Sequence, residues 1–477
     1  MPQKLIIVSN REPYFIKRAA DGRVVTQPST GGLVAALEPL LRAHGGVWIS
    51  WSGFEREAPK SGEPLPERVE LTQNGGAPCA VRCIPLTERE ASLYYYGFAH
   101  RALWPLCHQF LGKVDFDAEA WRAYKRVNQR FADAVLEESG DDDARVWIHD
   151  FHLALVPGML RAARPQMQIG FSWHAPWPPA DTLRALPWAQ ELLDGILGAN
   201  AIGFQLERHA RHFADTVREV SERDVTDKLI IAPMGVDATQ WGERARAARG
   251  GRAIRLRRNL SAERLVLAVD RVDFTRGIME RLDAVGHFFD RYPSYRGRVV
   301  FCQIAVPSRT RGEAYREMKK SIDDKVSAIN ARFQNGSWQP IRYVYRNLEP
   351  DELAVYYVGA EVMLATPLRE GINLPVLEYI AARINEDGAV VLSSLSGAAD
   401  VLPESLLVNP NSSDLVAAAL RTALEMEPAE TRQRMSALRN RVSHMDVTRW
   451  RREFSLRAFG DELEPPAETS TSVEATM

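Results

Sequence analysis

The sequence predicts an α/β protein whose 477 residues form two doubly wound halves that meet near residue 235. Short apolar strand patterns alternate with amphipathic helix patterns through most of the chain, which is typical of parallel sheets covered by helices. Polar and charged residues collect just after several predicted strands, where open α/β sheets bind ligands. The length exceeds what one hydrophobic core supports, so we expect at least two domains.

Composition excludes several classes of protein. Hydrophobic residues make up 45% of the chain and charged residues 26%, which is typical of a globular protein. The 60 basic and 62 acidic residues nearly balance, which argues against nucleic-acid and membrane-surface partners. No apolar run approaches the length of a membrane span, and the first strand is too short for a signal peptide. Four irregularly spaced cysteines form no zinc pattern and indicate a reduced, cytoplasmic protein.

The first half alternates strands and helices after an initial strand at 5–9. A polar loop follows this strand, and Gly31 and Gly32 then precede a helix, where they allow a backbone to approach a ligand closely. The further predicted strands are 47–51, 146–148, 169–173, 201–204 and 229–233, and the helices are 33–41, 114–139, 188–197 and 207–217.

The second half repeats this alternation from residue 265 onward. Its predicted strands are 265–269, 299–304, 342–345, 362–366, 390–393 and 406–408. We therefore expect domains at 1–235 and 236–445, and a terminal helix at 446–460 that packs back on the first domain. Residues 461–477 are rich in Pro, Glu, Ser, Thr and Ala, which predicts a disordered tail.

The stretch 365–379 reads as a strand end, a glycine-containing turn and a helix that begins near Asn373. Unpaired N–H groups and the positive end of the helix dipole make such a helix start an anion site. A diphosphate bound there would leave Glu378 near a ribose and Glu370 near the group that the diphosphate carries. Taken alone, the stretch fits an ordinary strand-loop-helix with exposed acids equally well.

Three arginines follow neighbouring strands of the second half. Arg271 and Arg276 come after strand 265–269, and Arg309 comes after strand 299–304. Parallel strands end at the same sheet edge, so these side chains are expected beside Glu370. Guanidinium groups match phosphate geometry, and their convergence on a helix start favours phosphate binding over simple surface solvation.

Aromatic and histidine residues mark the first half. The segment 93–98 and Trp104 are unusually aromatic; core packing accounts for most of these rings, but Tyr95 and Trp104 could stack on a sugar. His149-Asp150-Phe151-His152 and His174 follow strands 146–148 and 169–173. No third ligand lies nearby in the sequence, so hydrogen bonds to a polar substrate are favoured over a metal site.

These motifs resemble those of the trehalose-6-phosphate synthase family in the same order, over roughly residues 4–460. The resemblance implies a retaining glycosyltransferase of the GT-B architecture, with two facing Rossmann-like domains and a cleft between them. It rests on Ser9-Asn10-Arg11, Gly31-Gly32-Leu33, Tyr94-Tyr95, Leu103-Trp104-Pro105, His149-Asp150-Phe151-His152, His174-Ala175-Pro176-Trp177-Pro178, Arg271-Val272-Asp273, Pro307-Ser308-Arg309 and Glu370-Gly371-Ile372-Asn373-Leu374.

The resemblance implies a nucleotide-glucose donor in the second domain, with UDP-glucose as the first choice. Gly31 and Gly32 would approach the donor diphosphate from the first domain. Arg271 and Arg276 would neutralise it as it leaves, without a metal or other cofactor. Glu378 would bind the ribose hydroxyls. The other implied donor residues are Leu348 near the base and the helix start Asn373, Leu374, Pro375, Val376 and Leu377.

The implied acceptor is glucose 6-phosphate, held largely by the first domain. Arg11 and Arg309 would grip its phosphate, and Tyr95, Trp104 and Asp150 would position its sugar. His174 would line the space between the substrates, and Glu370 would bind the transferred glucose. The implied catalytic set is His174, Arg271, Arg276 and Glu370.

The sequence also departs from the family. Arg276 stands where the family usually has lysine, Glu370 where it has aspartate, and Ala175 where it has a larger aliphatic residue. Two alternatives therefore stay open, a synthase that uses glycerol 3-phosphate to make glucosylglycerol phosphate and a non-catalytic sugar-phosphate sensor. Association into a homo-oligomer is also left open.

Overall fold

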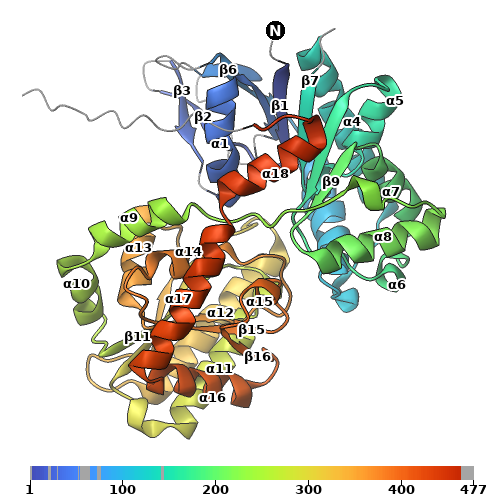
Figure 1. The fold of residues 1–477 in the computed structure, drawn as a ribbon. Coiled ribbons are helices and arrows are strands. Elements are labelled where there is room, and N and C mark those ends of the chain that lie inside the picture. Colours follow the sequence, from blue (N-terminus) through green and yellow to red (C-terminus); the bar gives the residue numbers. More distant parts are fainter. Residues whose placement is uncertain are drawn as a thin grey trace, which may run out of the picture.

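The structure is a computed structural model that describes residues 3–19, 23–29, 31–51, 53, 65–71, 77–140 and 144–463. It contains two α/β domains, each built around a twisted sheet with helices packed against it (Figure 1). The predicted fold class is confirmed. No helix among these residues has the length and apolar composition needed to cross a membrane.

The N-terminal domain is built on an eight-stranded sheet of order β10-β9-β8-β7-β1-β4-β6-β5. Its strands pair in parallel, except that β5 runs antiparallel to β6. The strand order reverses beside β1, so a ligand crevice is expected beyond the carboxyl ends of β1 and β7. The strands are β1 (Lys4–Ser9), β4 (Gly46–Trp51), β5 (Arg68–Leu71), β6 (Cys79–Ile84), β7 (Ala144–His149), β8 (Gln168–Trp173), β9 (Ala201–Phe204) and β10 (Leu229–Ile231).

The C-terminal domain is built on a six-stranded parallel sheet of order β13-β12-β11-β14-β15-β16. Its order reverses between β11 and β14, which places the second ligand crevice beyond the ends of these two strands. The strands are β11 (Arg264–Arg271), β12 (Val299–Val306), β13 (Ile341–Val344), β14 (Val362–Ala365), β15 (Ala389–Ser393) and β16 (Leu406–Val408).

Helices cover both sheets. Those before the first crossing between domains are α1 (Gly32–His44), α2 (Glu88–Ala91), α3 (Trp104–Cys107), α4 (Ala118–Ser139), α5 (Val156–Ala163), α6 (Ala180–Leu183), α7 (Ala189–Leu197) and α8 (Glu207–Ser221). Those after it are α9 (Ala238–Ala248), α10 (Gly251–Asn259), α11 (Ile278–Arg291), α12 (Glu313–Phe333), α13 (Pro350–Gly359), α14 (Leu374–Ala382), α15 (Ala398–Val401), α16 (Ser413–Glu425), α17 (Pro428–His444) and α18 (Val447–Phe459).

The chain passes between the domains twice, and the two crossings touch. A Cβ on Gly235 would lie 1.3 Å from the carbonyl oxygen of Met445, so only glycine fits at the first crossing. The second crossing leads from α17 in the C-terminal domain to α18 on the N-terminal domain (Figure 1). Phe454 of α18 would lie 2.7 Å from a Cβ on Gly170 or Gly203, so these two glycines let the helix sit directly on β8 and β9.

Several predicted boundaries were wrong. The polar loop after β1 contains an antiparallel hairpin of β2 (Tyr14–Arg18) and β3 (Val24–Pro28). The helix predicted from residue 114 begins at Ala118, because the Asp117 carboxylate caps the N–H of Glu119. Ordered chain continues past 461, since Leu463 is buried; the rest of the predicted tail, 464–477, lies outside the described residues.

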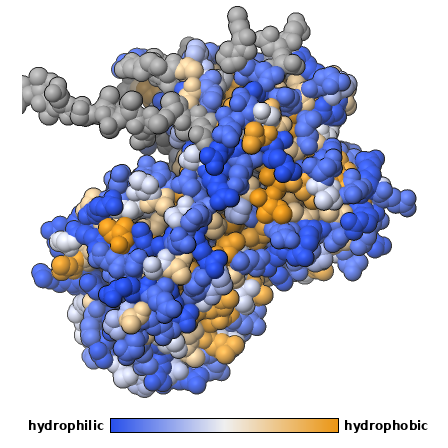
Figure 2. All heavy atoms as spheres, viewed as in Figure 1, coloured by the Kyte–Doolittle hydropathy of each residue, from blue (hydrophilic) through white to orange (hydrophobic). Residues whose placement is uncertain are grey.

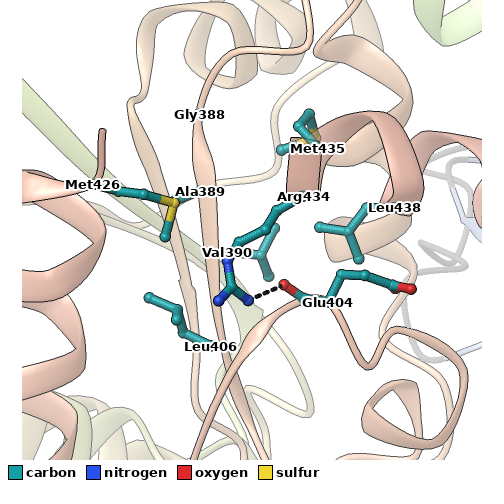
Figure 3. A pocket seen from close by; sticks show the side chains of 9 residues that line it. All are labelled: Gly388, Ala389, Val390, Glu404, Leu406, Met426, Arg434, Met435 and Leu438. Carbon is teal, nitrogen blue, oxygen red and sulfur yellow. Dashed lines mark hydrogen bonds between the residues drawn. The ribbon is translucent and has the colours of Figure 1, made fainter. Parts of the chain in front are cut away.

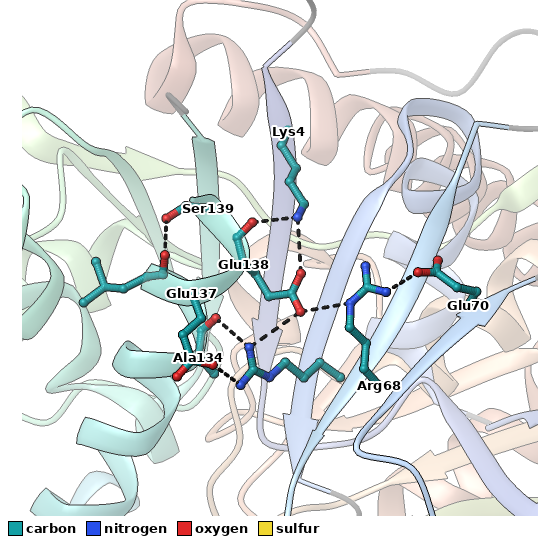
Figure 4. Close-up of polar contacts among 9 residues, drawn as sticks. Lys4, Arg68, Glu70, Ala134, Glu137, Glu138 and Ser139 are labelled. Atoms are coloured by element: carbon teal, nitrogen blue, oxygen red, sulfur yellow. Dashed lines mark hydrogen bonds and ion pairs between the residues drawn. The ribbon is translucent and has the colours of Figure 1, made fainter. Parts of the chain in front are cut away.

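Charged residues join the C-terminal end of α4 to the amino-terminal edge of the N-terminal sheet (Figure 4). Lys4 and Arg68 contact the Glu138 carboxylate at 3.2 Å and 3.0 Å, and its side chain is only 8% exposed. Lys4 also donates to the Glu138 carbonyl at 2.6 Å, which satisfies an otherwise free C=O at the helix end. This cluster therefore stabilises the edge opposite the expected crevice.

The C-terminal core is well filled. A cavity of about 10 Å³ lies among β15, β16 and α17, and Arg434 closes one side by donating to the Glu404 carbonyl at 3.0 Å (Figure 3). That volume holds little more than one water molecule. On the outside, Figure 2 shows a mostly hydrophilic face with apolar side chains gathered where the two domains meet.

Candidate active site

The centre of the site is the start of α14, which follows β14 after a short turn. As predicted, this helix begins directly after Asn373, whose side-chain oxygen accepts from the Val376 N–H at 3.1 Å. The same side chain donates to the Glu370 carboxylate at 2.7 Å. One amide therefore caps the helix and also fixes Glu370 at the boundary between the domains.

Glu370 pairs directly with Arg276, which lies in the turn after β11. The Glu370 side chain is 5% exposed and that of Arg276 is 20% exposed, so water screens this pair only weakly. The Nε of Arg276 is buried and has no hydrogen-bond partner among the described residues. The two positions that depart from the family thus contact each other.

Four arginines from both domains converge beside this pair. Arg271 ends β11 and is exposed, but protein atoms surround it. The surrounding protein displaces part of the water around Arg271, and this effect, together with repulsion from Arg11, Arg276 and Arg309, lowers the pKa of Arg271 below its ordinary value. Such mutual repulsion is relieved when an anion binds, so the charge of the cluster is suited to an anionic ligand.

The fourth arginine, Arg309, is held by residues of its own domain. Its guanidinium forms an ion pair with Asp273 and donates to the Tyr315 hydroxyl at 3.0 Å. It also lies 5.1 Å from the ring centre of Trp104, which belongs to the other domain. The sequence therefore predicted correctly that Arg309 lies at this sheet edge, although it did not show that Asp273 would hold it.

The two domains meet closely around the helix start. A Cβ on Gly32 would lie 2.4 Å from Leu374 Cδ1, and a Cβ on Gly371 would lie 2.9 Å from the His174 carbonyl oxygen. A side chain at Gly371 would press on the backbone of the other domain, whereas one at Gly32 would have to displace the Leu374 side chain. A Cβ on Gly31 would lie 3.7 Å from the Arg11 guanidinium, so the predicted glycine pair lies between the arginine cluster and α14.

His174 is fixed by two side chains. The Gln205 amide oxygen accepts from the Met234 N–H at 2.6 Å, so its nitrogen faces His174 Nδ1 at 2.8 Å. That nitrogen donates, which leaves Nδ1 unprotonated and places the proton on Nε2, 3.2 Å from His149 Nδ1. Burial lowers the pKa of both histidines. The His174 ring is therefore neutral and fully hydrogen-bonded, and it is not free to act as a base.

The predicted acceptor residues of the first domain lie around an aromatic cluster. Tyr95 belongs to a π-helical segment, Ser92–Leu103, and stacks on His152 with ring centres 5.7 Å apart. Asp150 has a positive φ of 73° and accepts from the His174 N–H at 3.3 Å, so its carboxylate is directed toward the strand ends. Neither ring nitrogen of buried His152 has a partner among the described residues. Two polar atoms beside the Tyr95 ring therefore have unused hydrogen-bonding capacity.

Glu378 lies one turn inside α14 and is partly buried. The Tyr357 hydroxyl donates to its carboxylate at 2.7 Å. Burial nevertheless raises the pKa of Glu378 to about 7, because the hydrogen bond from Tyr357 offsets only part of the desolvation. This carboxylate is therefore suited to accept hydroxyl donors that would stabilise its charge.

Most of the remaining residues that were predicted to bind the nucleotide-sugar donor belong to the hydrophobic core. Val376 and Leu377 are fully buried, and Leu348 is 6% exposed. Contacts of Val376 and Leu377 with a ligand would therefore come from their backbone, and Pro375 has no N–H to offer. Within the described residues, no group of three or more His, Cys, Asp or Glu side chains is arranged to hold a metal ion.

Sequence reasoning missed Gln205, Tyr315 and the role of Asp273. Gln205 follows β9 directly, as the other site residues follow their strands, so its position at a strand end was the available signal. Asp273 was part of a quoted motif, but a carboxylate among arginines does not say from the sequence alone which of them it contacts.

Two facing parallel-sheet domains, with an anion-binding helix start and converging arginines at their strand ends, define a GT-B glycosyltransferase. The comparison with known sequences gives the same class. A sequence profile described as glycosyltransferase family 20 matches residues 3–458, and the chain belongs to this family.

Named relatives are similar over nearly the whole chain. The trehalose-6-phosphate synthase of Mycolicibacterium smegmatis is 38% identical, over 96% of this chain and 93% of that protein. The Burkholderia xenovorans α,α-trehalose-phosphate synthase (UDP-forming), solved in complex with glucose-6-phosphate, is 30% identical with a TM-score of 0.85, over 95% and 99% of the two chains. An E. coli structure described as trehalose-6-phosphate bound with UDP-2-fluoro glucose has 30% identity and a TM-score of 0.82, over 94% and 97%.

Proposed function

We propose that this glycosyltransferase moves glucose from UDP-glucose to glucose 6-phosphate and forms α,α-trehalose 6-phosphate with retention at the donor carbon. The observation that carries the proposal is the likeness to the solved relatives described with glucose-6-phosphate and with UDP-2-fluoro glucose. The comparisons do not favour a glycerol 3-phosphate acceptor or a non-catalytic sensor, because the similar sequences are named trehalose-6-phosphate synthases.

The donor is assigned to the C-terminal domain, residues 236–445. Its diphosphate would lie between the start of α14 and Arg271, with Gly32 closing the other side. Arg271 and Arg276 would stabilise the negative charge that grows as the nucleoside diphosphate leaves. Glu378 would accept from the ribose hydroxyls, and the nucleotide-sugar is a substrate rather than a cofactor.

The acceptor is assigned to the N-terminal domain, residues 1–235, with Arg309 reaching in from the other domain. Arg11 and Arg309 would bind the phosphate, and Tyr95, Trp104 and Asp150 would position the sugar. We further assign the protein to the cytoplasm, in line with its composition.

The chemistry requires an attacking hydroxyl held close to the donor carbon. Glu370 is in an ion pair with Arg276 and accepts from Asn373, and His174 has both ring nitrogens engaged. These contacts support direct attack by the acceptor from the face that the leaving group vacates. Orientation by fixed groups would then supply most of the rate enhancement.

One assay tests the proposal. Purified protein is incubated with UDP-, ADP- or GDP-glucose and with glucose 6-phosphate or glycerol 3-phosphate, and release of the nucleoside diphosphate is measured. We expect release from UDP-glucose to depend on glucose 6-phosphate, and NMR to show two α-linked anomeric carbons in the product. Release that does not depend on glucose 6-phosphate, or that is faster with glycerol 3-phosphate, would contradict the proposal.

A further inference from the structure

Asp273 is a buried carboxylate at the boundary between the domains, 2% exposed and two residues beyond the end of β11. One of its oxygens accepts from the Thr275 N–H at 2.9 Å and from Trp104 Nε1 at 3.3 Å. The other pairs with Arg309 and accepts from the Tyr315 hydroxyl at 3.3 Å. Asp273 thus joins a side chain of the N-terminal domain to one of the C-terminal domain.

The hydrogen bonds that Arg309 makes with Asp273 and Tyr315 use one terminal nitrogen of its guanidinium. Nη1 donates to Asp273 and Tyr315, and the guanidinium carbon lies 5.1 Å from the ring centres of both Trp104 and Tyr315. Nε is buried and has no partner among the described residues. A buried N–H without a partner costs free energy, which an incoming phosphate oxygen would recover.

The backbone conformation of Arg309 indicates that the surrounding structure holds this residue in place. Its φ is +48°, a left-handed conformation that residues other than glycine adopt only where their surroundings enforce it. Arg309 also lies close enough to Arg271 and Arg276 to lower the pKa of both. Without a negative partner, this repulsion would push the Arg309 side chain away from the cluster.

Burial alone would raise the pKa of Asp273, but Arg309 and the Thr275 N–H outweigh burial and lower it. Asp273 is therefore ionised and keeps its charge beside Arg309. From these contacts we propose that Asp273 is a positioning residue for the acceptor: it holds Arg309 and Trp104, from opposite domains, in the arrangement that receives the phosphorylated sugar. The inference rests on the proposed function and names the residue that organises its acceptor end.

The opposite effect is also physically reasonable. Asp273 carries a negative charge near the phosphate, so a mere competitor for Arg309 would weaken acceptor binding. The two roles predict opposite changes in the acceptor KM when the carboxylate is removed. Removing a positioning carboxylate raises the acceptor KM, whereas removing a competitor lowers it.

The test is Asp273→Asn, which keeps the size of the side chain and removes its charge. We expect the glucose 6-phosphate KM to rise at least tenfold while the Kd for UDP, measured by calorimetry, stays within twofold. Asp273→Glu restores the charge and should recover part of the loss. An acceptor KM that is unchanged or lower, or a UDP Kd that rises as much as the KM, would overturn the proposal.

Two further variants separate positioning from folding. Trp104→Phe keeps an aromatic ring but removes the donor to Asp273. We expect it to raise the acceptor KM, and we expect the double variant with Asp273→Asn to raise it by less than the product of the two single effects. Asp270→Asn is the matched control, because it breaks a buried ion pair of the preceding strand β11 in which Trp104 and Arg309 take no part. It should lower the melting temperature without a selective rise in acceptor KM.

If Asp273→Asn does not fold, Trp104→Phe alone decides, and an unchanged acceptor KM in that variant overturns the proposal. Wild-type turnover is measured first with glucose 6-phosphate and glycerol 3-phosphate. Absence of turnover with glucose 6-phosphate refutes the proposed function. The Asp273 variants are then compared on the acceptor that the wild type uses, so that the two failures are distinguishable.

Discussion

Three buried ion pairs near the end of β11 differ in how completely the arginine is hydrogen-bonded, with Arg281–Asp270 on one side and the pairs of Arg276 and Arg309 on the other. Arg281 and Asp270 are 0% and 3% exposed, and the Arg281 guanidinium also donates to Thr366, Gln303 and the Arg276 carbonyl at 3.0 Å each. Every nitrogen of Arg281 has a partner within its own domain. In Arg276 and Arg309, by contrast, Nε is buried without a partner among the described residues.

The difference indicates which arginines at the strand ends a ligand could satisfy. A structural ion pair satisfies all its donors, because an unpaired buried donor costs about 1–3 kcal/mol. A pair that leaves such a donor open keeps it for a group that is not part of the chain. The two ring nitrogens of His152 also have no partner among the described residues, but so do Trp121 Nε1 and Arg249 Nε outside the site, so the criterion applies only to side chains that already lie at the strand ends.

Substitution of the structural arginine should give the largest effect. Arg281→Ala leaves Asp270 charged and unpaired in the core, which is expected to lower the free energy of unfolding of the C-terminal domain by about 3–5 kcal/mol. Denaturant unfolding followed by near-UV circular dichroism measures this change. If the variant kept wild-type stability but lost turnover, Arg281 would belong to the active site. The distinction between a structural arginine and the ligand-binding arginines would then fail.

Substitution of Arg271, which lies at the strand ends, should leave the fold intact. Arg271→Ala is expected to raise the barrier for transfer by about 2–4 kcal/mol, because one group that stabilises the leaving diphosphate is lost. Single-turnover kinetics with saturating substrates measures the barrier, and thermal unfolding provides the control. Near wild-type turnover in a folded variant would remove Arg271 from the donor site.

The sequence was sufficient to predict the fold class and which side chains lie at one edge of the C-terminal sheet. Strand and helix periods identified both parallel sheets, and the rule that ligands bind beyond strand ends brought Arg271, Arg309 and Glu370 to one edge. These inferences succeed because they depend on backbone direction. The hairpin of β2 and β3 was missed because both strands are short and charged or polar residues end or interrupt their apolar runs.

The sequence did not predict which side chains of the candidate site form ion pairs with one another. Arg276 could contact Glu370 or Asp273, and Arg309 could contact either as well, since all four side chains follow neighbouring strands. The choice depends on side-chain conformations and on the distance between the domains, which no local pattern encodes. Gln205 was missed for the same reason, because its role depends on Met234 at the crossing between domains.

A double-mutant cycle on Arg276 and Glu370 extends the comparison to an ion pair that is assigned to the substrate site. Glu370→Asp shortens the acid and separates it from Arg276, so activity should fall. The added change Arg276→Lys should recover part of it, with an interaction energy of about 0.5–3 kcal/mol in a double-mutant cycle. Turnover of wild type, both single variants and the double variant gives this value, and strictly additive effects would show that the two positions act independently.

The smallest expected effect concerns Glu378, whose incomplete stabilisation shows as a pKa near 7. A hydroxyl donor from ribose prefers the ionised carboxylate, so UDP affinity should rise as pH increases through this value and level off above it. If only the ionised form binds, the Kd for UDP is about tenfold weaker at pH 6 than at pH 8, which corresponds to about 1.4 kcal/mol. Calorimetric titrations across this range measure the change.

The effect on folding has the opposite sign. Because folding raises the pKa of Glu378 from its ordinary value of 4.5 to about 7, its contribution to stability is fully present below 4.5 and is lost as pH rises through 7. Glu378→Gln should therefore flatten both profiles, with weaker but pH-independent UDP binding. His174 and His149 do not interfere, since burial lowers their pKa and keeps them neutral. The same slope in Glu378→Gln as in the wild type would assign the titration to another group and remove Glu378 from the ribose contact.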